Sequence, residues 1–297
     1  MRERDWSSDV CSSDLMDKEF LFQKYDVSKK GARSSEFRNA FAKIKDSVFA
    51  NVKASNNPVF VFATGPSGAG KTGLEVKIEC DFPEQEFITL DIDEFRVYHP
   101  DIKEILSDYW TISADLTTSF AKDIRDELLN LALKQGYSVI FSASINRVEK
   151  AEKIIADIPK SYQIGLYAVI THPLEYRLTA EERYEREVFR KDFVPRCPDE
   201  NYMKKCDNFV KILPELVKLV DFFKVYRRQP SLNYLPLEFV CDDYSSELSS
   251  QLETPRPDYD EYFSRLVLLL NKRTNRANVT EEEIQRIFSL YDMYFSF

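Results

Sequence analysis

Gly65-Pro-Ser-Gly-Ala-Gly-Lys-Thr72 is the stretch of this sequence that decides the fold. It matches the pattern G-x-x-x-x-G-K-[ST], in which the backbone N–H groups of a glycine-rich loop surround the phosphates of a nucleotide. In this chemistry the Lys71 ammonium group reaches the β- and γ-phosphates, and the Thr72 hydroxyl group coordinates Mg²⁺. We therefore predict that the loop binds a nucleoside triphosphate through Gly65, Pro66, Ser67, Gly68, Ala69, Gly70, Lys71 and Thr72.

The residues on either side of the loop support this interpretation. Residues 58–64 form a continuous apolar, β-branched and aromatic run, which is typical of a strand buried on both faces of a parallel sheet. Residues 71–79 are predicted to form a helix whose positive end points at the bound phosphate. The alternative is a glycine-rich turn that matches by chance. The chain has seven glycines, and four of them lie between Gly65 and Gly73, which argues against that alternative.

Strand and helix patterns alternate through the middle of the chain. Predicted strands lie at 58–64, 87–92, 137–142, 162–170 and 222–226, and predicted helices at 71–79, 117–134, 148–158, 173–190 and 201–220. Such alternation produces right-handed βαβ units and a parallel sheet. We predict an α/β fold of the P-loop NTPase, kinase-like type, with three layers. Its core is expected at 58–227, after a helical N-terminal segment at 16–57.

The chain beyond residue 227 has a different pattern, and we predict a helical C-terminal extension at 228–297. Prolines favour irregular structure in its first part, at Pro230, Pro236, Pro255 and Pro257. Two closing helices are expected at 258–272 and 280–291. Thr280 and Glu283 have the spacing of a capping box, which marks the beginning of the second helix.

The first fifteen residues, MRERDWSSDVCSSDL, resemble a translated sequencing adapter and lack the apolar core of a signal peptide. We expect residues 1–15 to be a non-native leader and the native chain to start at Met16. The cysteines beyond the leader are scattered, without the spacing of a metal site: Cys80, Cys197, Cys206 and Cys241. We expect them to be reduced thiols of a cytoplasmic protein.

Composition and charge exclude several classes of protein. Hydrophobic residues make up 43% of the 297 residues, which is enough for a sizeable core and excludes a disordered chain. The formal net charge of −9 gives no overall field that would attract nucleic acid or an anionic membrane. The longest apolar runs are far too short to span a bilayer. We therefore expect neither a nucleic-acid partner nor a membrane partner.

A cluster of acidic residues follows the second predicted strand, in Asp91-Ile-Asp-Glu-Phe-Arg-Val-Tyr-His-Pro100. Acids at the carboxyl end of a parallel strand lie in the crevice where open α/β sheets bind ligands. A carboxylate there can accept a proton from a hydroxyl group or hold Mg²⁺. The alternative is an Asx turn or a helix cap that closes the strand.

The pattern D-x-D-x-F-R-x-x-H-P, about twenty residues after a phosphate loop, resembles the zeta-toxin family of P-loop kinases. Residues 135–141 resemble the third strand of that family, and Glu182-Arg-Tyr-Glu185 resembles its E-R-Y-E helix. Arg196 lies where the family has a second arginine, in a short proline-containing turn. The resemblance extends over residues 59–226.

The resemblance implies a set of catalytic residues. Asp93 is expected to be the general base that takes the proton from the acceptor hydroxyl group, and Asp91 to be structural. Arg183 and Arg196 are expected to neutralise the triphosphate during transfer, together with Lys71. ATP, Mg²⁺ and an antitoxin-like protein partner are implied in the same way.

The acceptor side departs from the family pattern. The family has a glutamate in an E-G-T-like segment after the third strand, and this sequence has Ser142-Ala-Ser144 instead. A serine cannot bind a sugar hydroxyl group as an anion. The candidate acceptor-binding residues are Arg96, His99, Ser142 and Ser144, with a structural histidine beside Pro100 as the alternative for His99.

The predicted function is an ATP- and Mg²⁺-dependent phosphotransferase of zeta-toxin type, which phosphorylates a hydroxyl group of a small molecule. The usual acceptor of the family is UDP-N-acetylglucosamine, a nucleotide sugar. One alternative is a nucleotide-binding switch or a degenerate toxin relative without kinase activity. Another is a different P-loop kinase that acts on nucleosides or nucleic acids.

Overall fold

The structure is a computed structural model that describes residues 12–190, 193–228, 237–243 and 252–296. Residues 1–11 of the predicted leader, as well as Pro230 and Pro236, lie outside these ranges. Cys80, Cys197, Cys206 and Cys241 are free thiols, as predicted. No helix in the described ranges has both the length and the apolar character needed to cross a membrane. The cytoplasmic location and the absence of a nucleic-acid partner stay predictions.

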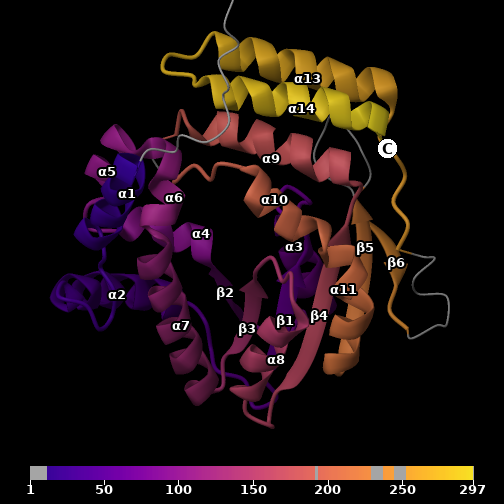
Figure 1. Ribbon diagram of the computed structural model, residues 1–297. Coiled ribbons are helices and arrows are strands. Elements are labelled where there is room, and N and C mark those ends of the chain that lie inside the picture. Colours follow the sequence, from indigo (N-terminus) through magenta and orange to yellow (C-terminus); the bar gives the residue numbers. More distant parts are fainter. Residues whose placement is uncertain (1–11, 191–192, 229–236, 244–251, 297) are drawn as a thin grey trace, which may run out of the picture.

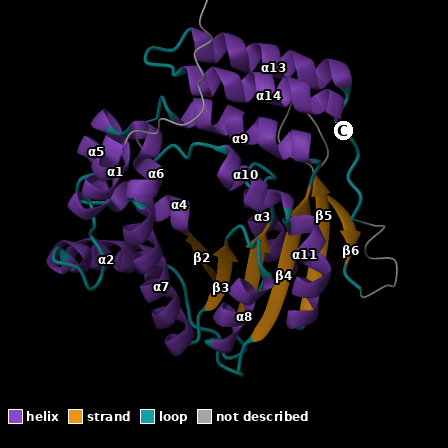
Figure 2. Ribbon diagram, in the orientation of Figure 1, coloured by secondary structure: helices purple, strands orange, loops and turns teal. Residues whose placement is uncertain are grey.

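A six-stranded sheet forms the centre of the molecule (Figure 2). Its strands are β1 (Val59–Thr64), β2 (Phe87–Asp91), β3 (Ser138–Ser142), β4 (Gln163–Ile170), β5 (Phe222–Arg228) and β6 (Leu237–Cys241), in the order β2-β3-β1-β4-β5-β6. The first five are parallel and confirm the predicted strands. The prediction of irregular structure at the start of the extension was wrong for β6, which pairs antiparallel with β5 at the edge of the sheet.

The central strand β1 is buried on both faces, because helices cover both faces of the sheet. Phe60 and Phe62 point into a core shared with α7 (Thr118–Gln135), α8 (Val148–Ala156) and α11 (Phe209–Leu216). Val59 and Val61 point into the opposite core, with α3 (Thr72–Asp81), α9 (Pro173–Glu187) and α10 (Glu200–Asp207). The period-two alternation of a strand thus divides one apolar run between two cores. The result is the predicted three-layer α/β fold.

Shorter helices surround this core. The N-terminal segment contains α1 (Ser12–Lys24) and α2 (Ser34–Phe49), and the chain between β2 and α7 contains α4 (Ile92–Phe95), α5 (Ile102–Asp108) and α6 (Ser113–Leu116). The single helix predicted at 201–220 is divided into α10 and α11, which meet at Asn208. Because strands β1–β5 are parallel, their carboxyl ends all lie at one edge of the sheet.

Two long helices close the chain, α13 (Tyr259–Thr274) and α14 (Glu281–Ser296), and both lie side by side over α9 (Figure 1). The predicted capping box is confirmed: the Thr280 N–H donates to Glu283 Oε2 at 2.8 Å, and the Glu283 N–H donates to Thr280 Oγ1 at 3.2 Å. Apolar side chains join the three helices, among them Leu178 of α9, Leu266 of α13 and Leu290 of α14.

Candidate active site

The phosphate loop leaves β1 and enters α3 without interruption. Gly68 and Gly70 have φ angles of 83° and 95°, the left-handed region that favours glycine. The loop also lies against α9, because a Cβ atom at Gly68 would collide with the Tyr176 carbonyl oxygen and would lie 2.9 Å from the Ala180 nitrogen. Glycine at this position therefore allows both the turn of the loop and its close contact with the helix.

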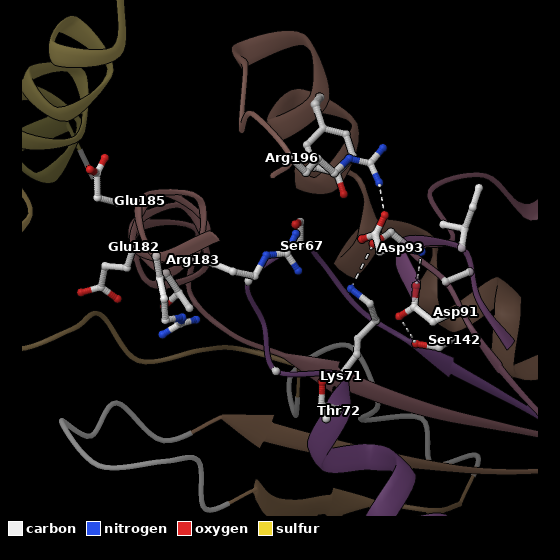
Figure 3. Close-up of a pocket in the computed structure, with 18 of the residues that line it drawn as sticks. Ser67, Lys71, Thr72, Asp91, Asp93, Ser142, Glu182, Arg183, Glu185 and Arg196 are labelled. Carbon is white, nitrogen blue, oxygen red and sulfur yellow. Dashed lines mark hydrogen bonds and ion pairs between the residues drawn. The ribbon is translucent and has the colours of Figure 1, made fainter. Parts of the chain in front are cut away.

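A cavity of about 1210 Å³ opens over this loop. Most of the predicted site residues line it, although they come from distant parts of the chain: Ser67, Gly68, Gly70, Lys71, Thr72, Asp93, Arg96, Ser142, Ser144, Arg183 and Arg196. The remaining residues of the loop, Gly65, Pro66 and Ala69, are buried. The structure thus brings the predicted donor residues and the predicted base to one cavity (Figure 3).

The Lys71 ammonium group folds back over the loop. Its Nζ atom donates to the carbonyl oxygens of Gly65 and Pro66, at 3.4 and 3.2 Å, and to Ser144 Oγ at 3.2 Å. Burial lowers the pKa of Lys71 below its ordinary value, and the charge of Arg183 lowers it further. A phosphate group in the loop would bring the negative charge that favours the protonated amine.

Asp91 ends β2 and positions the residue that follows it. Its Oδ1 atom accepts the backbone N–H of Asp93 at 2.9 Å, and its Oδ2 atom accepts the Ser142 hydroxyl group at 3.2 Å. Burial raises the pKa of Asp91, and the neighbouring charge of Asp93 raises it further. Asp91 therefore caps α4, which is the structural alternative that the sequence left open.

Asp93 lies opposite two arginines. Arg96 Nε donates to Asp93 Oδ1 at 2.8 Å, and Arg196 Nη1 lies 3.6 Å from the same oxygen. Burial raises the pKa of this carboxyl group, but three positive charges outweigh burial and hold the pKa well below its usual range: Arg196, Arg96 and Arg183. Asp93 is therefore ionised, which is the state required of a group that accepts a proton from a hydroxyl group.

Arg183 and Arg196 approach this site from α9 and from the turn before α10. In Figure 3 the Arg183 side chain extends from α9 toward the phosphate loop. Glu182 and Glu185 of the same helix form ion pairs with Arg265 and Arg273 of α13 instead. Arg183 Nε lies 3.5 Å from Glu187 Oε1, and the Arg196 guanidinium group lies 4.1 Å from the centre of the Tyr202 ring. Both arginines line the cavity with their positive charge.

The four candidate acceptor residues have different positions. Arg96 is 1% exposed and is occupied by Asp93, the Ala114 carbonyl oxygen and the Thr117 and Thr118 hydroxyl groups. Arg96 thus anchors Asp93. Ser142 donates to Asp91, and Ser144 donates to the Gly65 carbonyl oxygen at 3.0 Å. Ser142 therefore lies beside the structural Asp91, and Ser144 lies beside the phosphate loop.

His99 lies away from the cavity. Its Nε2 atom lies 3.0 Å from the Tyr25 carbonyl oxygen, and its Nδ1 atom accepts the Asp101 N–H at 3.2 Å. The proton on Nε2 satisfies both contacts, and burial lowers the pKa of the ring, which favours this neutral form. The geometry therefore favours the structural alternative for His99 over contact with an acceptor.

Several residues that line the cavity escaped the sequence analysis. Arg125 of α7 and Lys150 of α8 lie on the side of β3, and Arg265, Leu268 and Lys272 of α13 bring the C-terminal extension into the cavity. The position of Lys150 could have been inferred from the sequence, because the first turn of the helix that follows β3 lies near the carboxyl end of that strand. For α13 the sequence has no local signal, because its partner helix lies about 90 residues earlier in the chain.

Charged contacts connect the phosphate loop to α13 through α9. Arg228 Nη1 donates to the Gly68 carbonyl oxygen at 2.7 Å, and Arg228 Nη2 lies 3.3 Å from Glu175 Oε1. Arg265 Nη1 donates to the same Glu175 oxygen at 2.7 Å, while its Nη2 atom donates to Glu182 at 2.7 Å. The C-terminal extension therefore holds the helix that carries the catalytic candidate Arg183.

Known proteins share the sequence pattern and the fold. A model of the family described as Zeta toxin matches residues 43–233. Toxin PezT of Streptococcus pneumoniae is 26% identical over 204 residues, which cover 67% of this chain and 80% of the relative. Toxin zeta of Streptococcus pyogenes is 22% identical over 151 residues, which cover 50% of this chain and 52% of the relative.

Solved structures agree with this result at the level of the fold. A structure from the characterisation of the PezAT toxin–antitoxin system of Streptococcus pneumoniae superimposes with a TM-score of 0.61 at 22% identity, covering 80% of this chain and 96% of that chain. The AvrRxo1-ORF1:-ORF2 complex superimposes with a TM-score of 0.54 at 11% identity, covering 87% and 85%. Helices α13 and α14 lie outside the family match, which ends at residue 233. Because that match covers well over half of the sequence and includes the strand, the phosphate loop and both arginines, the chain belongs to the zeta toxin family.

Proposed function

We propose that this chain transfers the γ-phosphate of ATP to a hydroxyl group of a small-molecule acceptor. The observation that carries the proposal is the convergence of Lys71, Asp93, Arg183 and Arg196 on one cavity at the carboxyl ends of the strands. Phosphoryl transfer depends on positioning and on stabilisation of the negative charge that develops on the phosphate oxygens. Lys71, Arg183 and Arg196 supply the positive charge for this. Asp93, which is held by Arg96, accepts the proton of the acceptor hydroxyl group. The hydroxyl oxygen attacks the γ-phosphorus, the bond from that phosphorus to the bridging oxygen breaks, and ADP leaves.

The roles of Asp93 and Arg196 depend on each other. Arg196 Nη1 lies 3.6 Å from Asp93 Oδ1, and its charge lowers the basicity of that carboxylate. A bound triphosphate competes for the same guanidinium group, because arginine binds phosphate oxygens strongly. Asp93 then becomes a stronger base when the donor is in place. This coupling would direct proton removal toward the complex that holds ATP.

Mg²⁺ belongs to the proposal through the same residues. The Thr72 hydroxyl group lines the cavity, and a hard oxygen ligand of this kind, together with phosphate oxygens, suits Mg²⁺. When bound, the ion neutralises charge that develops between the β- and γ-phosphates. Thr72 would hold it at the start of α3.

The acceptor and the protein partner are proposed from the family. UDP-N-acetylglucosamine is the first acceptor to test, although Ser142 stands where the family has a glutamate. The solved relative from Streptococcus pneumoniae belongs to a toxin–antitoxin system. We extend this to the present chain and propose an antitoxin-like protein as its partner.

Transfer of labelled phosphate from ATP to UDP-N-acetylglucosamine tests the proposal. Lys71→Ala should weaken ATP binding and abolish transfer, whereas Asp93→Asn should keep ATP binding and lose transfer. Asp108→Asn, at an exposed position of α5, is the matched control and should behave as the original protein does. Normal turnover by Asp93→Asn would show that the base lies elsewhere. A protein that binds ATP but phosphorylates nothing in a metabolite extract would favour the nucleotide switch or degenerate relative.

A further inference from the structure

A pair of basic residues lines the cavity without a part in the proposed transfer step. Arg125 of α7 and Lys150 of α8 reach it from the side of β3, where Asn146 and Thr118 also line it. The family resemblance gives none of these residues a role. Their chemistry therefore has to be explained from their surroundings.

Lys150 is a half-buried cation that lacks a carboxylate partner. Its Nζ atom donates to the Ser144 carbonyl oxygen at 3.1 Å, and within the described ranges no Asp or Glu forms an ion pair with it. Burial, together with the charges of Arg125 and Arg196, lowers its pKa to about 8. A lysine held among arginines in this way is stabilised by an anion, which would supply the missing negative charge.

Arg125 is also only partly neutralised. Its guanidinium group forms an ion pair at 2.7 Å with Asp126, its neighbour in the chain, whose side chain is 45% exposed. The group lies 4.8 Å from the centre of the ring of Phe141, near the carboxyl end of β3. This packing fixes the guanidinium group against β3, and a fixed arginine is well suited to bind phosphate oxygens.

The position of Lys150 relates it to the reacting groups. Lys150 Nζ donates a hydrogen bond to the Ser144 carbonyl oxygen, and Lys71 Nζ donates one to the hydroxyl oxygen of the same serine at 3.2 Å. Arg125 and Lys150 therefore line the same cavity as Lys71, on the side of α7 and α8. In the proposed function the donor triphosphate takes the cations at the phosphate loop, which leaves Arg125 and Lys150 for another anion.

We propose that Arg125 and Lys150 form a second anion-binding subsite, which holds a phosphate or diphosphate group of the acceptor. The term acceptor rests on the proposed function, but the subsite itself does not. The inference favours hydroxyl compounds that carry phosphate as acceptors over neutral sugars. It also explains how recognition can work with Ser142 in place of a carboxylate, since the anion of the acceptor provides the main contact.

Binding of inorganic pyrophosphate to the protein saturated with Mg²⁺ and a non-hydrolysable ATP analogue tests the subsite directly. Calorimetry should detect one bound pyrophosphate. Lys150→Met and Arg125→Met should each weaken it roughly 10- to 100-fold, the loss expected for a charged hydrogen bond. Lys150→Arg keeps the charge and should bind within a few fold of the original protein. Lys153→Met, at an exposed position of the same helix, should have no effect.

The outcomes separate the subsite from the kinase proposal. Absence of pyrophosphate binding would overturn the subsite, and so would a Lys150→Met variant that weakens binding of the ATP analogue instead. Phosphate transfer would still be judged by its own assay.

In that assay UDP-N-acetylglucosamine should be phosphorylated and N-acetylglucosamine should not. Lys150→Met should raise the acceptor KM at least about tenfold and leave the KM for ATP unchanged. Equal use of the neutral sugar would overturn the link to the acceptor. Melting temperatures equal to that of the original protein exclude misfolding as the cause.

Discussion

Replacing Arg273 of α13 by methionine should destabilise the whole protein strongly. Arg273 is fully buried, and its Nη1 and Nε atoms donate at 2.8 Å to two buried glutamates of α9, Glu181 and Glu185. Methionine fills a similar volume but carries no charge. The substitution therefore removes a shared cation and leaves two carboxylates in a position that water reaches poorly.

The size of the effect follows from the partners that remain. Removing one member of a buried ion pair costs about 3–5 kcal/mol, because the other charge is left uncompensated. Here Glu181 keeps Arg286 at 2.7 Å and Glu185 keeps Arg276 at 3.1 Å, so the lower end of this range applies. We expect a loss of about 3 kcal/mol in the free energy of unfolding, which corresponds to a fall of roughly 6–12 °C in melting temperature.

Chemical denaturation followed by circular dichroism measures this loss. Lys218→Met is the matched control, since Lys218 and Glu215 form an ion pair at 2.7 Å whose side chains are 58% and 59% exposed. Such a surface pair contributes about 0–1 kcal/mol. If Arg273→Met lost no more stability than Lys218→Met, the buried charges between α9 and the extension would not be what holds them together.

Two further predictions concern the cavity. Gly68→Ala should weaken ATP binding more than about tenfold, because the added methyl group would collide with the Tyr176 carbonyl oxygen at a φ of 83° and push the loop away from α9. An unchanged dissociation constant for a fluorescent ATP analogue would contradict this reasoning. Pyrophosphate binding at the second subsite should weaken as the pH rises through about 8, because the lowered pKa leaves Lys150 charged below that pH and neutral above it. Calorimetry from pH 7 to 9 should show this fall in the original protein, and a matching fall in Lys150→Met would assign it to another group.

The sequence allowed the core of the fold to be predicted because its signals are local. The apolar run at 58–64 and the adjoining glycine loop specify β1, the loop and α3 within about twenty residues, and the structure confirms them. The edge strand β6 was missed, since a five-residue strand near several prolines has no pattern that separates it from irregular chain. Short-range spacing also predicted the capping box at Thr280.

The candidate site could be predicted only in part. Motif residues such as Lys71 and Arg183 were found because their types and spacing match a known pattern, and the structure brings them together. Lys150 and Arg265 were missed, because a basic residue in a helix is usually solvated and nothing in its neighbourhood indicates a distant cavity. Their positions depend on how separate helices pack, and only the folded chain contains that information.

The contacts between Gly68, Arg228, Glu175 and Arg265 give the C-terminal extension a thermodynamic relation to the nucleotide. If docking of α13 and α14 on α9 strengthens ATP binding by some free energy, ATP must strengthen that docking by the same amount, because the two equilibria are linked. With such coupling, the last two helices would respond to the occupancy of the phosphate loop from outside the cavity. A ligand or protein that loosened α13 would reduce the affinity for ATP without entering the cavity.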